Sequence, residues 1–103
     1  MIRIFVMAIF GCTLMMASAQ EGEKLFKEYC WGCHHQTAEA FGPSFRSIAN
    51  RRNVETIMAM MTDPEATSKA LGYRRNSMPA FDDLTPEQKS SLADYIMQFK
   101  DKK

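Results

Sequence analysis

Apolar residues recur along this chain at intervals of three and four, the spacing of an amphipathic helix, and no segment alternates as a strand does. The first such segment runs from Glu21 to about Trp31. The last begins at Thr85, where Pro86 and Gln88 complete the arrangement of an N-cap, a first-turn proline and a capping box. Its apolar stripe consists of Leu92, Tyr95, Ile96 and Phe99. The pattern predicts an all-α protein.

Shorter helices are predicted between these two. Ser44 and Asn53 can each cap one, and the helix after Asn53 has apolar residues at i, i+3, i+4 and i+7 until Asp63-Pro64 ends it. Residues 65–71 form another short helix that stops at Gly72, and residues 73–84 are expected to be an irregular loop. We therefore expect about four to five helices in a single domain of this 103-residue chain.

The first nineteen residues differ from the rest. Arg3 is the only charge before the apolar run of residues 4–16, and Ala17-Ser18-Ala19 matches an A-x-A cleavage site. The run is shorter than the ~20 apolar residues that comfortably span a bilayer. We expect residues 1–19 to be a cleavable signal peptide and residues 20–103 to be the mature domain, exported to the periplasm without an integral membrane segment. Lipid attachment at Cys12 is the alternative.

Charge gives little support to other partners. The formal net charge is +1 at pH 7, which favours neither nucleic acid nor a polybasic membrane contact.

The candidate chemistry is concentrated in Cys30-Trp31-Gly32-Cys33-His34. C-x-x-C-H is the attachment sequence of c-type haem, because two thiols can add to the haem vinyl groups and the histidine can bind the iron. A structural zinc site would need four ligands, and the chain has no second cysteine or histidine pair. A thioredoxin-type pair belongs to a βαβ context, and no strand pattern surrounds this one. The motif predicts one covalent haem c held by Cys30 and Cys33, with His34 as an iron ligand.

The second iron ligand is predicted by elimination. His35 is adjacent to His34, too close in the chain to reach the opposite haem face. Of the five methionines after residue 19, Met78 alone lies in the predicted loop, where Pro79 stiffens the backbone. The alternative is a buried methionine above an open or water-ligated iron. The methionines on predicted helices are Met58, Met60, Met61 and Met97.

These features together resemble the small monohaem class I cytochromes c, over essentially the whole mature sequence. The resemblance implies the small cytochrome c fold, with the N-terminal and C-terminal helices crossing at Gly22. It also implies that the Pro43 carbonyl accepts a hydrogen bond from His34, which would fix the imidazole. The residues that carry the resemblance are Gly22, Phe26, Cys30, Cys33, His34, Gly42, Pro43, Met78, Pro79, Leu92 and Tyr95.

Haem propionates need cationic partners, and three arginines are candidates for them: Arg46, Arg74 and Arg75. With both axial positions filled by His34 and Met78, the iron would have no vacancy for a substrate. We therefore expect a one-electron carrier rather than an enzyme, most simply a monomer that meets redox proteins such as a periplasmic dehydrogenase and a terminal oxidase. The alternatives are a dedicated haem subunit of a periplasmic dehydrogenase, for example a sulfite dehydrogenase, and an open-site haem enzyme or gas sensor.

Overall fold

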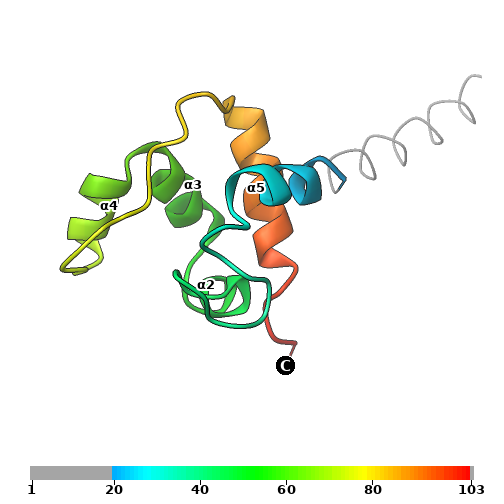
Figure 1. Cartoon of the computed structure of the whole chain (residues 1–103), viewed down its shortest axis with the longest axis horizontal. Helices are drawn as coiled ribbons and strands as arrows, with labels where there is room; N and C mark the ends of the chain where they lie inside the picture. The colour runs from blue at the N-terminus through cyan, green and yellow to red at the C-terminus, as the bar shows by residue number, and fades with distance from the viewer. Residues whose placement is uncertain (1–19, 103) are drawn as a thin grey trace, which may run out of the picture.

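The computed structural model describes residues 20–102, so the predicted signal peptide of residues 1–19 lies outside the described residues (Figure 1). The described part contains five helices and no strand, which confirms the predicted all-α class. An N-terminal helix covers residues 20–29. The others are α2 (Phe45–Arg51), α3 (Val54–Thr62), α4 (Pro64–Ala70) and α5 (Pro86–Met97).

Local chemistry sets the start of each labelled helix. The side chains of Ser44, Asn53 and Thr85 accept hydrogen bonds from backbone amides in the first turn of α2, α3 and α5, as predicted, and Thr85 with Gln88 forms the complete capping box. Asp63 follows the last residue of α3 and caps α4, in which Pro64 takes the first position. Helix α4 therefore begins one residue earlier than its sequence suggested.

Gly72 ends α4 in the left-handed conformation, with φ of 83°. The Tyr73 amide donates to the Ser68 carbonyl at 2.9 Å and the Gly72 amide to the Lys69 carbonyl at 3.1 Å. These two bonds form a Schellman motif, which satisfies carbonyls at the end of the helix and turns the chain sharply. The segment after Gly72 consequently leaves α4 as a loop and returns toward the start of α5 (Figure 1).

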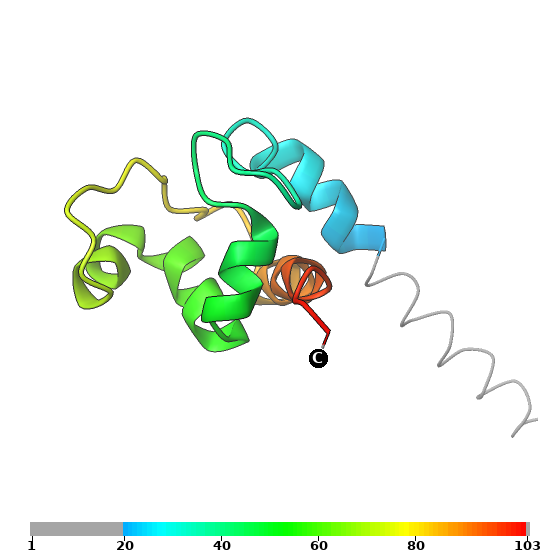
Figure 2. The same ribbon diagram turned by 90° about the horizontal axis from the view of Figure 1, so that it is seen from below.

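The N-terminal helix crosses α5 at a steep angle, as the view nearly along α5 shows (Figure 2). A Cβ atom added to Gly22 would lie 2.5 Å from the Ser91 carbonyl oxygen and 2.8 Å from the Tyr95 Cβ. The two backbones can approach this closely only because residue 22 has no side chain. This crossing is the one that the resemblance implied.

An aromatic cluster fills the space beside the crossing. The ring of Phe26 lies 5.0 Å from that of Phe45 and 5.5 Å from that of Tyr95, between ring centroids, and Phe26 and Phe45 are fully buried. Phe99 packs against Tyr95 at 5.3 Å, although α5 ends at Met97. The apolar stripe predicted for the last helix therefore continues past the helix end.

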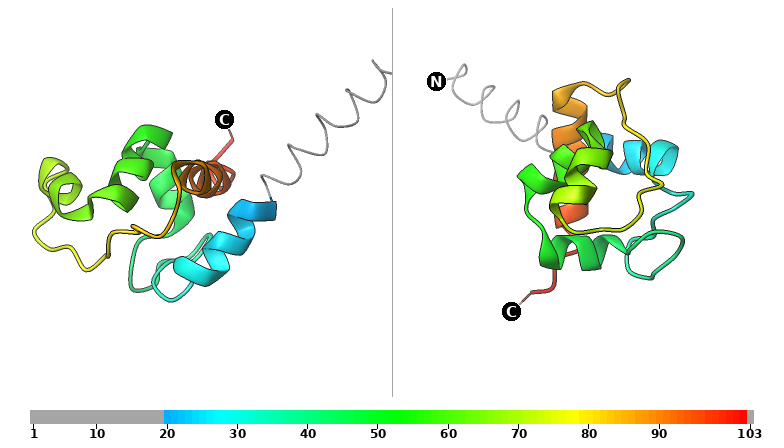
Figure 3. Two further views of the ribbon diagram at one scale, coloured as in Figure 1. Left: turned by 90° about the horizontal axis from the view of Figure 1, so that it is seen from above. Right: turned by 90° about the vertical axis from the view of Figure 1, so that its left-hand side faces the viewer.

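Helix α5 contacts both α2 and α3, and α3 contacts α4. The loop of residues 73–84 passes on the same side of the molecule as the turn that follows the N-terminal helix (Figure 3). The two segments form opposite walls of a cavity, which is the candidate site. Between residues 20 and 102, no helix has the length and apolar character needed to cross a membrane.

Candidate functional site

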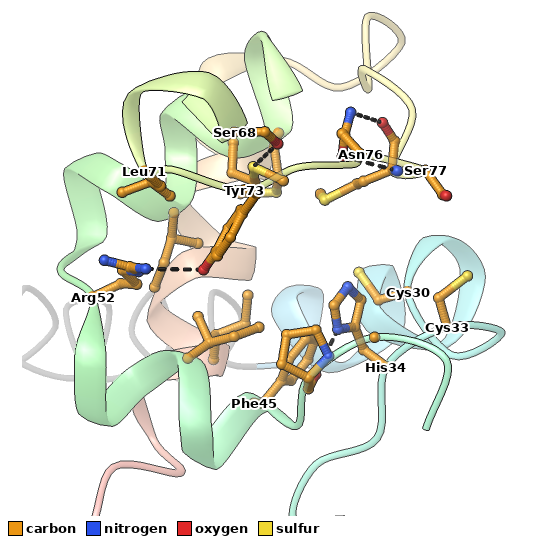
Figure 4. Close-up of a pocket in the computed structure, with 18 of the residues that line it drawn as sticks. Cys30, Cys33, His34, Phe45, Arg52, Ser68, Leu71, Tyr73, Asn76 and Ser77 are labelled. Atoms are coloured by element: carbon orange, nitrogen blue, oxygen red, sulfur yellow. Dashed lines mark hydrogen bonds between the residues drawn. The ribbon is translucent and has the colours of Figure 1, made fainter. Parts of the chain in front are cut away.

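The cavity has a volume of about 460 Å³ and lies between the turn of residues 30–43 and the loop of residues 73–81 (Figure 4), and α2 and α3 supply further residues of its wall. Its walls are mainly apolar, so the interior favours a large apolar ligand over water. The apolar side chains of the wall include Phe45, Ile48, Ile57, Met61, Leu71, Phe81 and Ile96.

Both cysteines reach the cavity from the end of the N-terminal helix. The Cys30 amide donates to the Phe26 carbonyl at 2.9 Å, and the His34 amide donates to the Cys30 carbonyl at 2.8 Å. These bonds continue the helix as a turn, so Cys30, Cys33 and His34 all line one cavity. Cys30 is buried and Cys33 is exposed. Burial, and secondarily the neighbouring Cys33, raises the pKa of the Cys30 thiol from 9.0 to about 12.

The His34 ring is fixed on several sides. Its Nδ1 donates to the Pro43 carbonyl oxygen at 2.7 Å, and its ring stacks on that of Phe45 with centroids 5.6 Å apart. A Cβ atom on Gly42 would lie 2.7 Å from the His34 Cε1 atom. Because Nδ1 carries the proton in the bond to Pro43, Nε2 retains the lone pair that a metal ion needs.

Three methionines line the cavity: Met60, Met61 and Met78. Met78 belongs to the loop of residues 73–81, and the preceding residues Asn76 and Ser77 lie across the cavity from His34 (Figure 4). The Met60 sulfur accepts a hydrogen bond from the Ser68 hydroxyl at 3.8 Å, and Met61 is only 2% exposed. Met60 was predicted only to lie on a helix, and its place in the cavity wall depends on how α3 packs against α4.

The predicted arginines are dispersed. Arg75 lines the cavity and also a neighbouring polar pocket, whereas Arg74 lines only that second pocket. Arg46 is absent from the cavity wall, and its Nε atom lies 3.4 Å from a carboxylate oxygen of Asp101.

Two arginines that the sequence analysis did not select, Arg51 and Arg52, also line the cavity. An Arg52 nitrogen donates to the Tyr73 hydroxyl at 2.9 Å, and the guanidinium lies 5.8 Å from the centre of that ring. In Figure 4, Arg52 and Tyr73 lie at the end of the cavity opposite Cys30 and Cys33. A sequence signal did exist, since two adjacent arginines stand where α2 ends and the short connection to α3 begins.

The residues of the cavity fit a covalent haem. Two thiols stand at one end, an imidazole with a free Nε2 lies on one wall, a thioether belongs to the facing loop, and the Arg52 guanidinium lies at the far end (Figure 4). The backbone of Gly42 lies close to the His34 ring, which is possible because residue 42 has no side chain.

The fold and this group of residues are those of a c-type cytochrome. The chain belongs to the family described as cytochrome C oxidase, cbb3-type, subunit III, whose model matches residues 17–96. Proteins of the cytochrome c family carry haem c, with its iron, as a covalent cofactor, and so does this one.

Two kinds of relative are similar to this chain. Cytochrome c oxidase subunit 2 of Alkalihalophilus pseudofirmus is 30% identical over 93 residues, which are 80% of this chain but only 26% of that protein. A cytochrome c from Rhodothermus marinus is 29% identical with a TM-score of 0.68, covering 82% of this chain and 78% of that one. An engineered form of the latter, bound to a carbene intermediate, is 32% identical with a TM-score of 0.66 over the same shares of the two chains.

Proposed function

We propose that this protein is an exported one-electron carrier whose haem is attached to Cys30 and Cys33 and ligated by His34 and Met78. One observation carries the proposal: two thiols, one imidazole and one loop methionine, spread over nearly fifty residues of sequence, line a single apolar cavity. A histidine and a methionine on opposite sides of a haem give a closed iron with a high reduction potential.

The residues of this chain suit electron transfer rather than the chemical conversion of a substrate. Haem c, when bound, supplies a one-electron iron couple. The Pro43 carbonyl accepts the hydrogen bond from His34 Nδ1, which fixes the orientation of the imidazole and leaves Nε2 free to bind a metal ion. The apolar wall excludes water, so little solvent has to reorganise when the charge of the site changes by one unit. Met78 on the loop side leaves no vacancy for a substrate, which favours a carrier over an enzyme.

The arginine end of the cavity suits the haem propionates. In haem the vinyl and propionate groups lie on opposite edges, and Arg52 and Tyr73 lie opposite the two thiols (Figure 4). The Tyr73 hydroxyl accepts from Arg52 and keeps its own proton to donate to a carboxylate. We therefore assign Arg52, Tyr73 and Arg75 to the propionates, in place of Arg46, which is engaged with Asp101.

The ligand assignment is tested by Met78→Ala, with Met60→Ala as the matched control because Met60 lines the same cavity. We expect Met78→Ala to abolish the weak thioether-to-iron absorption band of the ferric protein, lower the potential and admit cyanide readily. Met60→Ala should retain the band. Loss of the band in Met60→Ala, with its retention in Met78→Ala, would transfer the assignment to Met60.

A second candidate function follows from the relatives. The matching family model and the Alkalihalophilus pseudofirmus protein are both described as cytochrome c oxidase subunits, and this chain spans about a quarter of the latter. The protein would then deliver electrons as a haem domain bound to a terminal oxidase. Size-exclusion of native membrane extracts decides between the two. A carrier elutes alone as a monomer, whereas an oxidase subunit co-elutes with the other subunits at moderate salt.

Export is the remaining part of the proposal. A cytochrome c domain suggests an exported protein, and the A-x-A pattern at residues 17–19 supports signal cleavage and a periplasmic location. The intact mass of the haem protein from its native host should equal residues 20–103 plus one haem. A mass that retains residues 1–19, or that includes a lipid on Cys12, would contradict the cleavage.

A further inference from the structure

The loop that carries Met78 has few attachments of its own. It is fixed at its start by the Schellman motif around Gly72 and at its end by the Phe81 amide, which donates to the Met61 carbonyl at 2.9 Å. Among the described residues, the backbone of residues 74–80 makes no hydrogen bond to another backbone group. A segment with so few bonds would sample several conformations unless side chains restrain it.

Asn76 supplies that restraint. Its Nδ2 atom donates to the Met78 carbonyl at 3.0 Å, and its Oδ1 atom accepts from the Met78 amide at 3.1 Å (Figure 4). One side chain thus binds the peptide groups on both sides of the Met78 Cα atom, which restricts the rotation of each. Because the amide can only donate and the carbonyl can only accept, the two bonds also fix which way the Asn76 amide points.

Pro79 adds a second restraint. A residue that precedes proline is kept out of the helical region, so Met78 is confined to an extended backbone. Together the proline and the two Asn76 bonds define the direction of the Met78 Cα–Cβ bond. The flexible remainder of the side chain then starts from one fixed point on the cavity wall.

We propose that Asn76 is a positioning residue that holds Met78 toward the haem iron and keeps the loop from opening. The inference rests on the proposed function, in which Met78 is the iron ligand. It assigns a role to Asn76, an exposed residue that hydrogen-bonds to the backbone of Met78.

The test uses the haem-loaded protein with Asn76→Ala, Asn76→Asp and the control Ser77→Ala. Ser77 adjoins Asn76, also lines the cavity, and its side chain makes no hydrogen bond with the described residues. Cyanide can bind the ferric protein only when Met78 has left the iron, so its association rate measures the population of the open loop. Loss of two exposed hydrogen bonds should raise that rate by about three- to tenfold in Asn76→Ala. Asn76→Asp keeps the acceptor and loses the donor, so its rate should be intermediate.

Hydrogen exchange of the Met78 amide gives a readout that does not depend on iron chemistry. The exchange should be faster in Asn76→Ala and unchanged in Ser77→Ala, while the midpoint of global unfolding stays close to that of the wild type. Equal cyanide rates and equal Met78 exchange in Asn76→Ala and Ser77→Ala would overturn the inference. Failure of the ligand assignment itself is recognised separately, because Met78→Ala would then retain the thioether-to-iron band.

Discussion

Gly42 lies so close to His34 that no side chain can stand between them. A Cβ atom at residue 42 would be 2.7 Å from Cε1 and 3.0 Å from Nδ1 of the imidazole. The Gly42 amide also donates to the Cys33 carbonyl at 2.6 Å. The backbone at residue 42 therefore supports the ring and the end of the C-x-x-C-H turn at once, and neither can shift alone.

The first prediction concerns this contact. Gly42→Ala should push the His34 ring off its bond to Pro43, so that the histidine binds iron less well and the reduction potential changes. Haem content per chain should also fall. Gly32→Ala is the control in the same region, since nothing lies within 4 Å of a Cβ placed there. A potential in Gly42→Ala equal to that of Gly32→Ala would contradict the expectation.

The second prediction concerns the helix crossing. Gly22→Ala places a Cβ 2.5 Å from the Ser91 carbonyl oxygen, so the two helices must separate. Overpacking of this kind costs about 1–3 kcal/mol, and each kcal/mol lowers the Tm of a domain of this size by about 4–8 °C. Thermal unfolding of the haem protein measures the loss, with the exposed neighbour Glu21→Ala as control. Equal melting temperatures for the two variants would show that the crossing tolerates a methyl group.

The third prediction separates packing from ligation. Met61 lines the cavity but is only 2% exposed and belongs to the central cluster of buried residues. Met61→Ala should lower the free energy of unfolding by about 2–5 kcal/mol and retain the thioether-to-iron band. The bond from the Phe81 amide to the Met61 carbonyl survives this substitution, so the loop keeps its anchor. Disappearance of the band in a variant that still folds would make Met61 a ligand.

The fourth prediction compares two arginines. Arg52→Ala removes a cation from the cavity wall and should lower the reduction potential by on the order of tens of millivolts, because a nearby positive charge disfavours the ferric state. Arg46→Ala removes a cation that lies outside the cavity wall and pairs with Asp101, and should leave the potential almost unchanged. Protein-film voltammetry measures both. A larger shift in Arg46→Ala would place the propionates near α2 and Asp101.

The fifth prediction concerns the haem-free chain. Burial raises the pKa of Cys30 from 9.0 to about 12, so the folded state binds the thiol proton more tightly than the unfolded state does. This contribution to stability is complete below about pH 9 and is lost as the pH rises toward 12. Urea unfolding between pH 8 and about pH 10.5 should show declining stability in the wild type. Cys30→Ala should lack the part of the decline that the Cys30 thiol causes. An identical decline in the wild type and in Cys30→Ala would contradict the raised pKa of Cys30.

The helices were predictable because their signals are local. Ser44, Asn53 and Thr85 cap the helices that they were expected to cap, and each contact spans three residues. The first helix ends at residue 29 rather than near Trp31, because the backbone of residues 30–33 changes to turn geometry where Cys30 enters the cavity.

The residues of the site that were not predicted from the sequence are brought together only by the tertiary structure. Arg52 meets Tyr73 only after α3 and α4 bring the loop back across the cavity, and no periodicity encodes that path. Met60 likewise lines the cavity only because of how the helices pack, which no periodicity encodes. The Asn76 contact with Met78 spans two residues, yet its importance is visible only when the surrounding backbone is seen to lack other bonds. The sequence therefore predicted Cys30, Cys33, His34 and Met78 as site residues, and these four line one cavity, whereas the residues that support them became evident only from the structure.

The packing of Gly22 against Ser91 and Tyr95 also orders events in time. The crossing joins the first helix of the described domain to the last, so it cannot form until nearly the whole chain has been synthesised. Before the crossing forms, the segment that carries Cys30 and Cys33 lacks its packing against α5, so we expect both thiols to be accessible. In the folded domain Cys30 is buried. We therefore expect haem attachment to precede the enclosure of Cys30.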